Sequence, residues 1–71
     1  MNRVALEERL EQTERNVSEA KRHVVRLREL MAEVQRGDID IRLARNLVWQ
    51  FERSLAAHIC ERNRLRRQLG L

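Results

Sequence analysis

Apolar residues recur along the first half of the chain at alternating steps of three and four. The run begins at Leu6 and ends at Val34, and Thr13 fills its one polar gap. A heptad spacing held for about four repeats places the apolar side chains along one stripe of an α-helix. The pattern therefore predicts a long amphipathic helix over about residues 3–35.

The pattern is interrupted by the stretch QRGDID, which contains Gly37 and Asp38. Glycine readily adopts the left-handed backbone conformation that follows a helix, and aspartate accepts hydrogen bonds from the free N–H groups that begin the next one. We therefore expect a turn at 36–38 and a second helix over about 39–69. A connection this short makes the two helices antiparallel neighbours.

The second half of the chain carries a matching apolar stripe, with His58 and Arg62 as polar members. Folding the chain at the turn places Phe51 beside Val24, so that the two stripes face each other. The predicted hairpin seam comprises Leu6, Leu10, Val17, Val24, Leu27, Met31, Val34, Ile41, Val48, Phe51, Leu55, Leu65 and Leu69.

The apolar arc of the second helix is wider than the narrow stripe that two helices need, which indicates that further helices pack against it. A chain of 71 residues rarely builds a sufficient core alone, and its single cysteine excludes an internal disulfide. We therefore predict an all-α, antiparallel two-helix hairpin, coiled-coil-like, that dimerises into a four-helix bundle. The candidate oligomer interface comprises Leu43, Leu47, Trp49, Ala56, Ile59 and Cys60.

Trp49 has an alternative arrangement, in which its ring lies along the side-chain stems of Arg45 and Arg53 in the same helix. In that arrangement the indole would not need a second copy of the chain to cover it.

The composition supports a single helical domain over residues 1–71. There is no proline, only two glycines are present, and 37% of the residues are charged; this is typical of long helices. No apolar run approaches the roughly 20 residues of a membrane span, and the start MNRVALEERLEQ lacks the apolar core of a signal peptide. Together with the lone cysteine, these features predict a cytoplasmic protein.

The stretch HICERN, residues 58–63, combines residue types that suggest chemistry. On a helix only positions three or four apart share a face, so His58, Cys60 and Glu61 point in three directions and cannot hold one metal ion. No base lies three or four residues from Cys60 to activate its thiol. We therefore expect no enzyme activity, no cofactor, no metal and no small-molecule substrate.

The net charge of +4 is carried mainly by arginine, whose planar fork suits phosphate groups. The first hypothesis is an interaction or structural protein that presents a helical face to a protein partner or to itself. The second is non-specific binding of an RNA or DNA backbone in a regulatory role. The third is an antitoxin-like regulatory helix. The candidate contacts to phosphate or to an acidic partner are Arg42, Arg45, Arg53, Arg64, Arg66 and Arg67.

A resemblance to a known family rests on four stretches: ALEERLEQTERNV, RHVVRLREL, RGDID and FERSLAAHICERNRLRRQLG. Through them the chain resembles, over nearly its whole length, a family of short uncharacterised bacterial proteins that each form a helical hairpin. Trp49 and Cys60 depart from the blander residues expected there. The resemblance implies a one-domain hairpin and no activity, cofactor or catalytic residue. The expected dimer is also similar, in overall shape only, to the small plasmid RNA-binding Rop protein.

Overall fold

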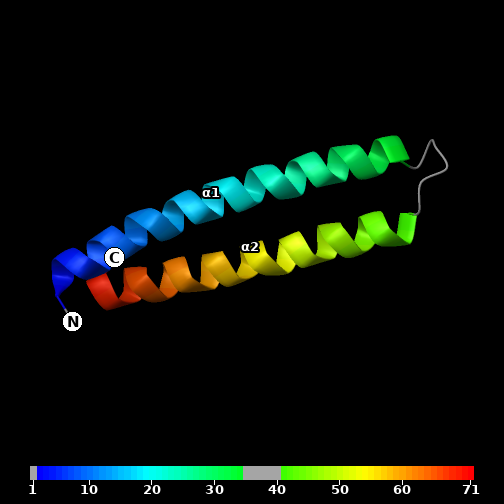
Figure 1. Ribbon diagram of the computed structural model, residues 1–71. Coiled ribbons are helices and arrows are strands. Elements are labelled where there is room, and N and C mark those ends of the chain that lie inside the picture. Colours follow the sequence, from blue (N-terminus) through cyan, green and yellow to red (C-terminus); the bar gives the residue numbers. More distant parts are fainter. Residues whose placement is uncertain (1, 35–40) are drawn as a thin grey trace.

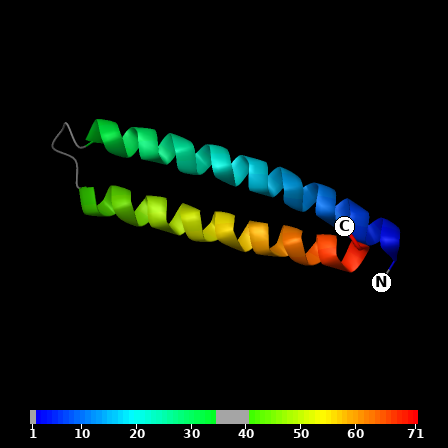
Figure 2. The same ribbon diagram turned by 180° about the vertical axis from the view of Figure 1, so that it is seen from behind.

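The computed structural model describes residues 2–34 and 41–71, apart from the side chains of Val34 and Ile41. It contains two helices, α1 (Arg3–Val34) and α2 (Ile41–Leu69). The helices lie side by side and run in opposite directions, so that the N- and C-termini lie at the same end (Figures 1 and 2). This arrangement confirms the predicted all-α two-helix hairpin.

The predicted turn lies outside the described residues, together with its Gly37 and Asp38. The same holds for the last residue of the first predicted helix and for positions 39 and 40 of the second. The seam positions 34 and 41 belong to the described helices, but the burial of their side chains is not described.

Both helix ends beside the termini are capped. The Oδ1 atom of Asn2 accepts a hydrogen bond from the N–H of Val4 at 3.1 Å, which satisfies one of the free donors that begin α1. At the end of α2, Gly70 adopts a φ of 77°, and the N–H of Leu71 donates to the carbonyl of Arg66 at 2.8 Å. This left-handed glycine ends α2 as a Schellman motif does.

The core lies in the seam between the helices and is tightest near the termini. Leu65 is only 1% exposed and clusters with Leu10 and Leu69, and Leu6 packs against them. Further along the seam, Leu27, Met31 and Leu55 are half-buried. Among the described side chains, the buried apolar residues are Leu10, Val17, Ala20, Val24, Val48, Leu65 and Leu69.

Two polar residues of the seam, Thr13 and Arg62, find hydrogen-bond partners close to them in the chain. Thr13 is 5% exposed, and its hydroxyl donates to the carbonyl of Arg9 at 2.8 Å. The half-buried Arg62 donates to Oδ1 of Asn63 from both Nε and Nη2, each at 3.3 Å. Among the described residues, no buried side-chain nitrogen or oxygen lacks a partner. The buried Thr13 hydroxyl therefore does not carry the cost of an unpaired donor.

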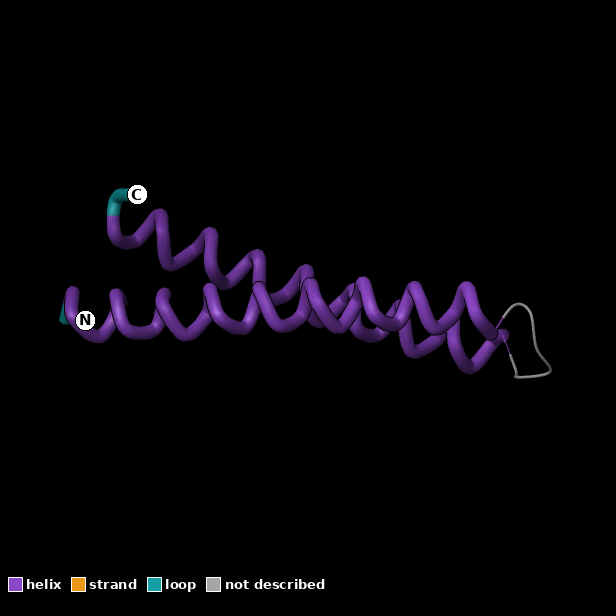
Figure 3. The backbone as a smooth tube through the Cα atoms, turned by 90° about the horizontal axis from the view of Figure 1, so that it is seen from above, coloured by secondary structure: helices purple, strands orange, loops and turns teal. Residues whose placement is uncertain are grey.

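The hairpin is long and thin. Its extents are 53 × 15 × 14 Å, and its radius of gyration is 16.0 Å, against about 11 Å for a compact domain of this length. Seen from above, the helix axes cross at a small angle (Figure 3), as they do when side-chain ridges pack into grooves. Two helices shield only one stripe of each other, so the sides of both helices remain open to solvent.

Candidate functional site

One edge of the groove between the helices is bridged by ion pairs. Arg28 Nε donates to Glu52 Oε1 at 3.2 Å, and Arg66 Nη2 donates to Glu14 Oε1 at 3.3 Å. Glu14 and Arg28 are two heptads apart in α1, so both pairs lie on the same edge of the hairpin. We call it the ion-pair edge.

The opposite edge carries a shallow hollow of about 230 Å³ at mid-length. Within it the rings of His23 and Phe51 meet with centroids 5.9 Å apart, and the small residues Ala20 and Ser54 lie next to this ring pair. We call it the histidine edge because both histidines line it. Its lining residues are Asn16, Glu19, Ala20 and His23 from α1, with Phe51, Ser54 and His58 from α2.

This hollow suits a side chain of another helix better than a ligand. Ligand pockets in proteins usually measure about 300–1,000 Å³ and are more enclosed. In the described part of the chain, no group of three or more His, Cys, Asp or Glu residues could hold a metal ion. Both histidines line the shallow hollow at the surface of the hairpin.

The histidine edge also exposes apolar surface. Phe51, which was predicted in the hairpin seam, keeps 37% of its surface exposed, because its ring packs at a tilt against the exposed ring of His23. Leu47, one turn earlier in α2, is 40% exposed. Leu30, two turns after His23 in α1, is 44% exposed. These side chains leave a face that no described part of the chain covers.

The predicted oligomer interface does not form one surface. Leu47 lies on the histidine edge, one turn before Phe51, and Leu43 lies one turn before Leu47. Ile59 is two turns after Glu52, which places it on the ion-pair edge, where it is half-buried. The helical rotation of about 100° per residue separates these side chains, although they are close in sequence.

Trp49, Ala56 and Cys60 occupy a different face of α2 from Leu47, because two residues turn the helix by about 200°. Trp49 is 55% exposed, and the guanidinium carbon of Arg53 lies 4.9 Å from the centroid of its ring. Trp49 therefore lies against Arg53 of its own helix, as the alternative arrangement predicted for this arginine. The thiol of Cys60 is free and exposed.

The six candidate arginines do not line up as one basic stripe. Arg64 donates to Glu61 in its own helix, Arg66 pairs with Glu14 across the ion-pair edge, and Arg53 covers Trp49. Arg53 and Arg67 share a face two heptads apart. Exposed Arg45 and Arg42 lie at the other end of α2. A phosphate backbone following α2 would meet these cations on different sides.

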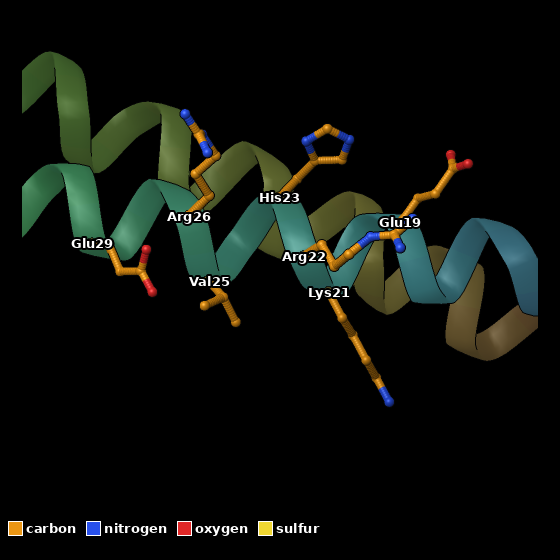
Figure 4. Close-up of a pocket in the computed structure, with 7 residues that line it drawn as sticks. All are labelled: Glu19, Lys21, Arg22, His23, Val25, Arg26 and Glu29. Carbon is orange, nitrogen blue, oxygen red and sulfur yellow. The ribbon is translucent and has the colours of Figure 1, made fainter.

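A second hollow runs along the outside of α1. All seven of its lining residues belong to this helix. Figure 4 shows Val25 and Lys21 pointing to one side of α1, while Glu19, His23 and Arg26 point to the other. These side chains do not converge on a common point, so the hollow is not an enclosed site for a small ligand.

The carboxylate of Glu61 joins two arginines at the end of the hairpin near the termini. It accepts a hydrogen bond from Arg64 Nη2 at 2.7 Å and pairs with Arg9 Nη2 of α1 at 3.3 Å. The hydrogen bond from Arg64, together with the positive charges of Arg64 and Arg9, holds the pKa of Glu61 below its ordinary value of 4.5, and partial burial opposes this only in part.

Replacing Glu61 with glutamine is expected to lower the melting temperature at about pH 7 and to matter less at about pH 3. Because the folded-state pKa lies below 4.5, the carboxylate stabilises the fold fully above that value. This contribution is lost as the pH falls through the lowered folded-state pKa. Circular-dichroism melts over this range measure the difference between parent and variant. Glu8→Gln is the control, since Glu8 makes no ion pair with a described residue. If the difference in melting temperature between the parent and Glu61→Gln did not become smaller as the pH is lowered, the prediction would be wrong.

No protein-family model, no curated protein and no solved structure matches the chain. Within the described residues, neither helix is long and apolar enough to cross a membrane.

Proposed function

We propose that the protein acts by binding and not by chemistry: two hairpins associate as a four-helix bundle, and this homodimer presents a helical surface to a partner protein. The exposed free thiol of Cys60 supports a reducing compartment such as the cytoplasm.

The observation that carries this proposal is the excess of exposed surface on the hairpin. The chain of 8.5 kDa exposes 5704 Å², against about 4650 Å² for a compact monomer of this mass. The excess is close to the roughly 800 Å² that each partner buries in an interface of standard size. Leu43, Leu47 and Phe51 supply apolar area for such an interface.

Binding of an RNA or DNA backbone is a second hypothesis, and it has less support. The arginines of α2 lie on several faces, and Arg64 and Arg66 are already paired with glutamates. The antitoxin-like role would use the same apolar surface to bind a different protein. The solution mass distinguishes the two hypotheses, because the proposal expects the free protein to be a dimer and the antitoxin-like role expects a monomer.

The solution mass tests the proposal directly. Light scattering on a sizing column, over a dilution series, is expected to give twice 8.5 kDa, falling toward the monomer mass on dilution. Circular dichroism at each concentration reports whether the helices persist. A folded protein of 8.5 kDa at every concentration would contradict the dimer and would direct the search toward a different protein that covers the apolar face.

A further inference from the structure

Resting on the proposed function, we infer that the second copy docks on the histidine edge. The two hairpins are then related by a two-fold axis that crosses α1 between Glu19 and Arg26. In such a symmetric contact, a residue on one side of the axis in one copy meets a residue on the other side of the axis in the second copy. Each contact therefore occurs twice in the dimer.

Charge complementarity supports this placement. Glu19 and Arg26 lie four residues before and three residues after His23, and both are exposed. Figure 4 shows all three side chains pointing to the same side of α1. Neither Glu19 nor Arg26 makes an ion pair with a described residue. The axis places Glu19 of each copy opposite Arg26 of the other, so that two charges left unpaired in one hairpin become paired in the dimer.

Shape complementarity points to nearly the same axis. Phe51 and His23 are level with each other across the groove, since their rings are in contact. Three residues closer to the termini on each helix, Ser54 and Ala20 are level with each other and line the same hollow. A two-fold axis between these two levels places the rings of His23 and Phe51 in one copy over the small residues Ala20 and Ser54 in the other copy. This level lies within about 1.5 Å of the midpoint between Glu19 and Arg26.

The other faces of the hairpin fit a second copy less well. The ion-pair edge is already bridged by Arg28–Glu52 and Arg66–Glu14. The face of Trp49 is partly covered by Arg53. On the histidine edge, the described ion pair between the helices is Arg9–Glu61, near the termini and away from the hollow. The middle of this edge therefore combines apolar area, a hollow and unpaired charges of both signs.

Charge reversal at the two rim positions tests the inference. Glu19→Arg alone and Arg26→Glu alone are each expected to weaken self-association by about tenfold, because two attractive contacts per dimer become repulsive. A mixture of the two variants should form a heterodimer in which both contacts are attractive again. Native mass spectrometry distinguishes the two variants by mass, and circular dichroism confirms that each remains helical.

The matched controls are the separate variants Glu8→Arg and Arg15→Glu, and a mixture of the two. These residues are also seven positions apart in α1 and exposed, but they lie on its outer face and far from the axis. Their self-association should equal that of the parent, with no preference for the mixed dimer.

The outcomes separate this inference from the proposed function. Weakened single variants and a preferred heterodimer support both. A parent dimer whose rim variants associate as tightly as the parent overturns the histidine-edge placement and leaves the homodimer standing. A parent that is monomeric at all concentrations overturns both.

Discussion

Replacing Val24 with aspartate is expected to unfold the hairpin. Val24 is 5% exposed and lies in the middle of the seam. A carboxylate there would lose its water without gaining a partner, at a cost on the order of 4 kcal/mol. A chain of this size obtains only about 3–5 kcal/mol from one core, so the change removes most or all of the free energy of unfolding. Far-UV circular dichroism should show loss of helix at room temperature.

The adjacent residue provides a control. Val25 is 56% exposed, so Val25→Asp introduces the same group one position away while leaving it in water. We expect it to change the free energy of unfolding by less than about 0.5 kcal/mol. Equal effects at the two positions would contradict the burial pattern of α1, since helix propensity alone would affect both alike.

Truncation of Leu65 to alanine is the second large effect, expected to lower the free energy of unfolding by about 3 kcal/mol. Leu65 is 1% exposed and lies in the cluster with Leu10 and Leu69. Removing its side chain beyond Cβ loses apolar burial and leaves a cavity between two long helices. Urea denaturation followed by circular dichroism measures the loss.

Leu43→Ala is the matched control when both variants are compared at a dilution at which the protein is monomeric, because it makes the same substitution in the same helix at a residue that is 60% exposed in the single hairpin. Its cost should remain under about 1 kcal/mol. If Leu43→Ala were as damaging as Leu65→Ala, the core could not be centred on the end of the hairpin where the termini lie.

Much of the fold could be predicted from the sequence because it follows from local periodicity. The step of three and four from Leu6 to Met31 specifies a helix and the face it buries. When two such stripes are joined by a short connection, the compact arrangement is an antiparallel pair of helices. Gly70 carries a further signal of this kind, because a glycine after a helical pattern favours a left-handed cap.

The candidate site was predicted less well. The predicted oligomer interface combined Leu47 with Trp49, whose side chains lie on different faces of α2. A strict angular projection would have separated them and would have placed His23 beside the seam. It would not have shown that the Phe51 ring meets the His23 ring and stays 37% exposed.

The sequence by itself determined two amphipathic helices, their antiparallel order and the residues that face each other across the seam, because these depend on spacing along one chain. The tertiary structure decided which edge of the groove became closed. Arg28 reaches Glu52 and Arg66 reaches Glu14 on one side, while His23 and Phe51 meet beside a hollow on the other. That difference depends on the relative height and crossing of the two helices and on side-chain rotamers, which no spacing within a single helix encodes.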